Sequence, residues 1–196
     1  MTRRVRAVSH EDRLTLVEHL DELRARIIVC AATLVVALAL CFWQNHLLLE
    51  FANGPLPSGH EKLLTIGVTE PLMTTVTVAV YGALLLAMPV IVYQVYAYIL
   101  PAFSDAERRV VLPILLLAPL LFLAGVAFAY FVVMPAAVDF LLNFNDTEFE
   151  VQVRARDYYG FFGTTMLAGG IVFQLPLAVI AVTRLGIVEI DQLRAN

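Results

Sequence analysis

The sequence has 196 residues, of which 60% are hydrophobic and 15% charged, and its mean hydropathy is +0.81. Soluble domains carry about 25% charged residues, so the composition excludes a water-soluble enzyme, a DNA-binding module and a disordered chain. The net charge is −4, so the sequence lacks the excess of basic residues that indicates nucleic-acid binding. Asp, Glu, Lys and Arg are absent from 27–49, 71–104, 110–138 and 158–183. Each stretch exceeds the roughly 18 to 20 residues that a helix needs to cross a bilayer, which predicts an all-α polytopic membrane protein.

The charged N-terminal segment becomes amphipathic before the first apolar stretch. Leucines and an isoleucine recur at helical spacing at Leu16, Leu20, Leu23 and Ile27, while charged residues fill the other faces. The spacing predicts a helix over 14–26 that runs directly into the first span. Because a long charged segment precedes this span, we expect it to be retained and not cleaved as a signal peptide.

In chain order, we expect one domain with spans at about 27–47, 71–98, 110–135 and 158–183 and caps at 48–70 and 139–157. Ten of the 13 Lys and Arg residues fall on the N-terminal side of the membrane in this arrangement. The positive-inside rule therefore predicts a cytoplasmic N-terminus and extracytoplasmic caps.

Three prolines fall inside the expected spans, at Pro89, Pro119 and Pro176. An interior proline removes a helical hydrogen bond and bends the axis. In lipid, the freed carbonyl must find a partner or face a wet cavity. We therefore expect bent helices that enclose a concavity.

The spans contain no acidic or basic side chain except His46, at an edge. Proton- and sodium-coupled transporters place such groups at mid-membrane to hold the ion. No catalytic motif and no cluster with metal-ligand spacing occurs, so we expect no enzymatic activity, no metal and no cofactor. A small-solute transporter or channel subunit remains the alternative function, and a purely structural scaffold is a third.

Acidic residues gather at the expected cytoplasmic edge, with Glu22 before the first span and Glu107 after the second. One interpretation is that they form surface ion pairs, each contributing roughly 0 to 1 kcal/mol. The other is that two carboxylates on separate helices accept a pair of guanidiniums, through charge-assisted hydrogen bonds of roughly 1.5 to 3 kcal/mol each. Spacing alone favours the first interpretation.

Several stretches form one extended pattern: EHLDELRAR (18–26), PVIVYQVYAY (89–98), PAF (101–103), ERR (107–109), GVAFAYFVVMP (125–135) and FQLP (173–176). Their content and their order, from about Leu14 to Arg194, resemble the TatC family, the receptor subunit of the twin-arginine protein translocase. An extended pattern of this kind is far more specific than any short motif.

The resemblance implies a receptor, in the bacterial inner membrane, for the twin-arginine signal peptides of folded cargo. Such a receptor recruits the single-span subunits TatA and TatB, assembles with other TatC copies and draws on the proton-motive force. The resemblance assigns signal-peptide binding to Glu22, Arg24, Tyr98, Pro101, Phe103, Glu107 and Arg109. It assigns cap structure or assembly to Pro55, Glu70 and Tyr130.

Two departures from the family pattern qualify the resemblance. The family has six spans and this sequence has four, so we expect a chain truncated at its C-terminus. Many relatives carry a glutamate in the fourth span where this sequence has Gln174. We expect Gln174 to be a polar site that faces a partner helix. The alternative is a buried amide bonded to a carbonyl that Pro176 frees.

Overall fold

A computed structural model describes residues 10–57, 63–99, 105–144, 147–148 and 151–184, with side chains at all of these positions except 10–18, 105–112, 114–115, 181–182 and 184. Its helices, in chain order, are α1 (His10–Trp43), α2 (Asn45–Asn53), α3 (Glu70–Ile99), α4 (Asp105–Phe128), the π-helix η2 (Ala129–Val133), α5 (Met134–Asn143), α6 (Ala155–Val172) and α7 (Leu175–Arg184). Within the described residues, the only β-pairing is an isolated parallel bridge between Leu64 and Arg154.

Within the described part of the chain, four helical stretches are long and apolar enough to cross a membrane: His19–Trp43, Glu70–Ile99, Leu116–Asn143 and Ala155–Ile180. They overlap the four ranges expected from the sequence. The prediction of an all-α membrane protein with four long apolar helices is therefore confirmed.

The third and fourth stretches differ in detail from the expected spans. The third continues beyond 135, because η2 adds a π-helical turn without ending the helix and α5 carries it to Asn143. The second cap consequently begins later than 139. The fourth is interrupted at Phe173 and Gln174, just before Pro176, which lies in the first turn of α7. Proline fits the first turn of a helix because no N–H is needed there.

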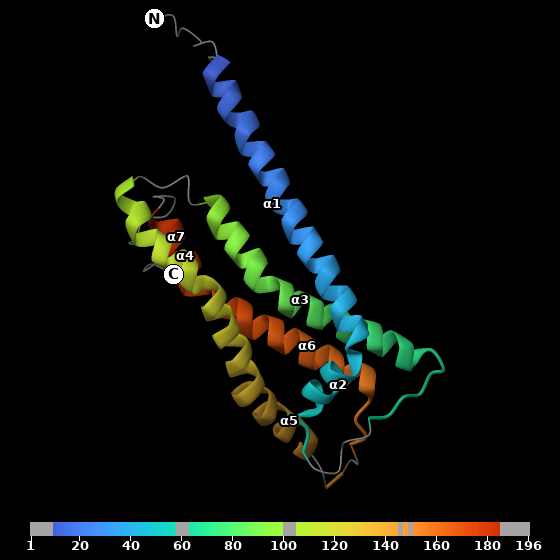
Figure 1. The fold of residues 1–196 in the computed structure, drawn as a ribbon. Helices are drawn as coiled ribbons and strands as arrows, with labels where there is room; N and C mark the ends of the chain where they lie inside the picture. The colour runs from blue at the N-terminus through green and yellow to red at the C-terminus, as the bar shows by residue number, and fades with distance from the viewer. Residues whose placement is uncertain (1–9, 58–62, 100–104, 145–146, 149–150, 185–196) are drawn as a thin grey trace, which may run out of the picture.

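Pro89 lies inside α3, and Pro113 and Pro119 lie inside α4. Both helices continue through these positions, and the axis of α3 is visibly bent along its length (Figure 1). The bend in α3 is the expected response of a helix to an interior proline, which removes one hydrogen bond.

Small side chains allow the helices to approach closely. Ala79 and Ala83 on α3 are buried against Ala37 and Cys41 on α1. At the crossing of α4 and α6, a Cβ added to Gly125 would lie 2.5 Å from the carbonyl oxygen of Gly169. Because lipid provides no hydrophobic driving force between helices, such close van der Waals packing contributes to their association.

The largest buried cluster lies toward the end of the bundle that carries α2 and α5 (Figure 1), and it includes Met134, Val138, Tyr158, Phe162 and Met166. We call this end the cap end. Beside it, an apolar cavity of about 270 Å³ opens among α1, α2, α3, α4 and α6; its lining includes Leu48, Phe51, Val78 and Tyr159.

Candidate functional site

The side of the bundle opposite the cap end carries residues 19–26 of α1, residues 94–99 of α3 and the first turns of α4, residues 105–109 (Figure 1). We call this side the rim. His19, Glu22 and Arg26 share one face of α1, since their spacing of three and four residues matches the helical repeat. The ring of His19 stacks on that of Tyr98, with centroids 4.4 Å apart and an interplanar angle of 15°. The stack fixes this face of α1 against the end of α3.

A polar network at the rim joins α1 to α3. Arg26 donates from Nε to Glu22 Oε1 at 3.1 Å and from Nη2 to the same oxygen at 2.5 Å. It donates from Nη1 to Gln94 Oε1 at 2.8 Å, and Nη2 also lies 3.4 Å from the carbonyl oxygen of Ala97. Arginine suits this position because its planar guanidinium carries five fixed donors. The network therefore sets the position of the Glu22 carboxylate relative to both helices.

The Glu22 side chain remains 35% exposed, and its two oxygens differ. Oε1 is held by Arg26, whereas Oε2 lies 3.9 Å from His19 Nδ1 and accepts no hydrogen bond among the described residues. An ionised carboxylate has about four lone-pair sites. Glu22 can therefore accept further N–H donors from a ligand at the rim.

At the cap end, a second polar network joins the two caps. Glu70, at the start of α3, accepts hydrogen bonds from the backbone N–H groups of Ile66 and Gly67, at 2.9 and 3.1 Å. Arg154 donates to it from Nε at 2.7 Å and from Nη2 at 3.3 Å. The hydrogen bond to Glu70 and the attraction between the two charges raise the pKa of Arg154 above its ordinary value. Arg154 is therefore held in its charged form beside the Glu70 carboxyl group.

Tyr130 closes the end of α2. Its hydroxyl donates to the carbonyl oxygen of Phe51 at 3.0 Å, and its ring stacks on the Phe51 ring at 4.3 Å. The same carbonyl oxygen also accepts from the Gly54 N–H at 3.2 Å, so Tyr130 adds a second donor, from η2, at the end of α2. Gly54 and Pro55 follow directly, and a Cβ on Gly54 would collide with the Tyr130 hydroxyl.

Gln174 lies in the interruption between α6 and α7. Its Nε2 donates to the carbonyl oxygen of Ala118 on α4 at 2.9 Å. Its Oε1 is buried and has no hydrogen-bond partner among the described residues. The amide is thus bonded to α4, and not to the carbonyl that Pro176 frees.

A sequence profile for the Sec-independent protein translocase protein (TatC) matches residues 18–196. The chain belongs to the TatC family. It is 37% identical over 191 residues to TatC of Escherichia coli (strain K12), covering 95% of this chain and 74% of that protein. It is 35% identical over 185 residues to TatC of Deinococcus radiodurans, covering 91% and 68%. The resemblance to the family is therefore confirmed.

A crystal structure of the twin arginine translocase receptor TatC superposes with a TM-score of 0.79 at 30% identity, covering 90% of this chain and 79% of that one. The fold of this chain is therefore the TatC fold. As a TatC protein with four long apolar helices, it is a multi-pass membrane component of the Sec-independent protein translocase, and TatC is a protein-transport family and not an enzyme family.

The structure brings some of the site residues predicted from the TatC resemblance together. Glu22 and Tyr98 both contact His19 at the rim, while Arg24 is exposed on α1. Pro101 and Phe103 lie outside the described residues. Glu107 and Arg109 belong to the first turns of α4, but their side chains are not among those described.

The remaining predicted residues lie elsewhere in the TatC fold. Pro55, Glu70 and Tyr130 lie at the cap end, and Gln174 lies at the break of the fourth apolar stretch. Among the described side chains, no group of three or more His, Cys, Asp or Glu residues could hold a metal ion.

Sequence reasoning missed two partners within these networks. From the sequence, no role was assigned to Gln94 or Arg154. A polar side chain in an apolar helix and a lone arginine beside a helix start both indicate a partner, but the sequence does not say which residue it is. The structure identifies Arg26 and Glu70.

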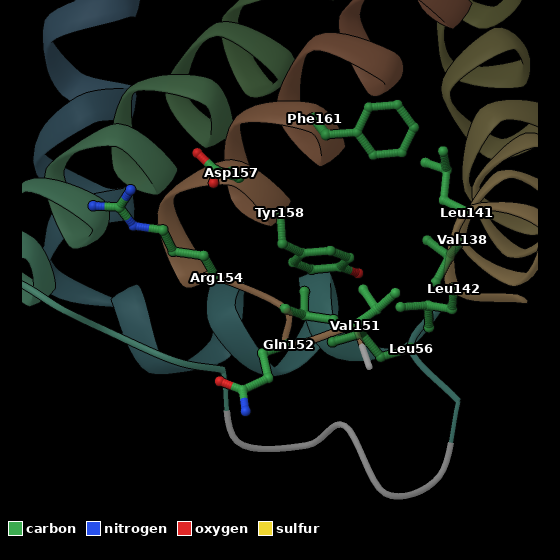
Figure 2. Close-up of a pocket in the computed structure, with 11 residues that line it drawn as sticks. Leu56, Val138, Leu141, Leu142, Val151, Gln152, Arg154, Asp157, Tyr158 and Phe161 are labelled. Carbon is green, nitrogen blue, oxygen red and sulfur yellow. The ribbon is translucent and has the colours of Figure 1, made fainter. Parts of the chain in front are cut away.

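A second apolar cavity, of about 390 Å³, lies at the cap end between α5, α6 and the segment that precedes α6. Leu141, Val138 and Phe161 surround it, and the Arg154 side chain points away from it, as Figure 2 shows. Its lining includes one acid, Asp157, and one arginine, Arg154, so it offers no pair of carboxylates to a peptide with two arginines. The rim, with its exposed carboxylate, is the better candidate for recognition in this TatC protein.

Proposed function

We propose that this chain is the signal-peptide receptor of the twin-arginine translocase and binds the arginine pair of folded cargo at the rim. The observation that carries the proposal is the Glu22 carboxylate, which is fixed by Arg26 and retains an oxygen without a hydrogen bond among the described residues. The crystallised relative is a twin arginine translocase receptor, which supports the same role.

In this proposal Glu22 accepts one guanidinium and Glu107, in the first turns of α4, accepts the other. Each charge-assisted hydrogen bond contributes roughly 1.5 to 3 kcal/mol. A guanidinium offers planar, paired N–H donors to a carboxylate, whereas an ammonium acts as a point charge, so lysines bind less well. Residues around the two acids shape the site, namely Arg24, Tyr98, Pro101, Phe103 and Arg109.

We place the rim on the cytoplasmic side of the bacterial inner membrane. Among the described residues, most arginines lie on the rim side of the four apolar stretches, and the positive-inside rule retains that side in the cytoplasm. Cargo signal peptides are synthesised there, so the acids of the rim face the compartment from which the ligand arrives.

Partner binding is proposed for the membrane and cap surfaces. Gln174 is assigned to a polar group on a TatA or TatB helix, and binding there requires the helices around its buried Oε1 to move apart and expose it. Pro55, Glu70 and Tyr130 maintain the cap against which other TatC copies assemble. Transport through the assembled complex draws on the proton-motive force.

A photo-crosslinking experiment tests the location of the site. A twin-arginine signal peptide with benzoylphenylalanine beside the arginines is bound to the chain in lipid nanodiscs, and adducts are mapped by mass spectrometry. We expect adducts in 19–26 and 94–99 that are lost in Glu22→Gln and retained in Asp21→Asn, a matched change at an exposed neighbouring acid. Adducts confined to the cap end would contradict the proposal.

A further inference from the structure

Arg26 directs its donors inward and bridges two helices at the rim. Two of its hydrogen bonds go to a single oxygen of Glu22, one turn earlier on α1. The others reach Gln94 Oε1 and the Ala97 carbonyl oxygen on α3. The side chain is only 24% exposed, so its charge is partly withdrawn from water. It is placed to act on Glu22 and has little surface to offer to a ligand.

Gln94 determines how Arg26 holds the acid. An isolated arginine and carboxylate favour a bidentate fork that occupies both oxygens. Here Nη1 is turned to Gln94 Oε1 at 2.8 Å, and the contacts to Glu22 all fall on Oε1. The second oxygen, Oε2, is thereby left open.

This arrangement changes what Glu22 can recognise. The internal guanidinium neutralises the charge of the carboxylate, so a cation gains little from long-range attraction to it. A donor that points an N–H group at Oε2 still gains a directed hydrogen bond. The pair therefore responds to the geometry of a ligand more than to its charge.

We infer that Arg26, anchored by Gln94, is a specificity-determining positioning residue, which makes Glu22 favour a signal arginine over a signal lysine. The inference rests on the proposed function, because it requires that Glu22 contact the signal peptide. Arg26 acts through Glu22 and Gln94 acts through Arg26, and neither needs to touch the ligand.

The test is the ratio of dissociation constants for twin-lysine and twin-arginine signal peptides. Labelled peptides are titrated with the chain in lipid nanodiscs, and binding is followed by fluorescence anisotropy. In Arg26→Gln the Glu22 charge is uncompensated and attracts either cation, so the ratio falls about tenfold, chiefly because the twin-lysine peptide binds more tightly. Arg156→Gln, at an exposed arginine of the cap end, removes the same charge and leaves the ratio unchanged.

Two variants of Gln94 test the anchor without removing the arginine. Gln94→Leu releases Arg26 to occupy both oxygens of Glu22, so the twin-arginine peptide binds about threefold to tenfold more weakly and the ratio falls. Gln94→Asn keeps a neutral amide on α3 and retains more of the preference for arginine than Gln94→Leu does. Thermal unfolding of each variant shows whether it is folded.

The outcomes separate this inference from the proposed function. If Glu22→Gln leaves twin-arginine binding unchanged, the proposed site is wrong. If Glu22→Gln weakens binding while Arg26→Gln and Gln94→Leu leave the ratio unchanged, only the inference is overturned. An equal loss of both peptides in Arg26→Gln would also overturn it, because that result assigns Arg26 a purely structural role.

Discussion

Glu70 and Arg154 lie 84 positions apart in the sequence and form an ion pair with Nε 2.7 Å from Oε1. The pair joins the residue that starts α3 to the residue that precedes α6. Beside it, Leu64 N donates to the Val153 carbonyl oxygen and Ala155 N donates to the Leu64 carbonyl oxygen, both at 2.9 Å. The two caps therefore form one unit that is held by polar contacts.

Breaking the pair should destabilise this unit. Glu70→Gln leaves one side-chain oxygen to accept hydrogen bonds where the carboxylate has two, and Arg154 loses its charged partner. We expect thermal unfolding in detergent, followed by intrinsic fluorescence, to occur several degrees lower, and Arg154→Gln to behave similarly. Glu148→Gln, at an exposed acid of the same end, should have no effect.

The double variant of Glu70 and Arg154 checks the mechanism. Residues that form one interaction show non-additive effects, so the double variant should lose less stability than the two single losses combined. Fully additive losses would show that the two residues contribute independently.

Gly54 and Tyr130 should show a different kind of coupling. Gly54 has an ordinary helical backbone, with φ −51° and ψ −41°, so its need for glycine comes from the nearby Tyr130 hydroxyl. Tyr130→Phe loses one hydrogen bond, at a cost of about 0.5 to 1.5 kcal/mol. Gly54→Ala should be destabilising in the parent protein and nearly neutral in the Tyr130→Phe background. An equal cost in both backgrounds, measured by thermal unfolding, would contradict this account.

The helices of this fold could be predicted because the local composition of a sequence indicates where membrane helices lie. Uncharged stretches long enough to span a bilayer predicted all four apolar helices. The interruption before Pro176 was not predicted, although proline provides the physical reason for it. The π-helical turn at Ala129–Val133 was also missed, because an apolar sequence does not distinguish the hydrogen-bond spacing of a π-helix from that of an α-helix.

The site could be predicted only in part. Arg26 and Glu22 are four residues apart on a helix, a spacing that allows a local ion pair. Their link to Gln94 spans 68 positions and depends on how α1 and α3 pack. The Glu70 and Arg154 pair depends in the same way on the approach of two caps. Such partners follow from tertiary structure and not from local pattern.

Gln174 should contribute to the recruitment of TatA. Replacing it by leucine removes Oε1, an acceptor that is buried in the free chain and pairs with a partner helix only once exposed, where such a hydrogen bond contributes roughly 0.6 to 2 kcal/mol. Co-purification of TatA from the same organism should therefore fall roughly threefold to thirtyfold. Thr164→Val is the matched control, because the Thr164 hydroxyl is already bonded to carbonyl groups of its own helix. Unchanged recruitment in Gln174→Leu would make this residue a structural amide that binds Ala118.

The measurement that tests the account most directly is the affinity of a twin-arginine signal peptide for the chain in lipid nanodiscs. Glu22→Gln removes the charged acceptor at the rim, whereas Asp21→Asn removes the same charge from an exposed neighbour. The account predicts that Glu22→Gln weakens binding by about tenfold or more, as the loss of a charge-assisted hydrogen bond requires, while Asp21→Asn binds like the parent. Equal affinity in both variants and the parent would contradict the assignment of Glu22 as a receptor for the signal arginines.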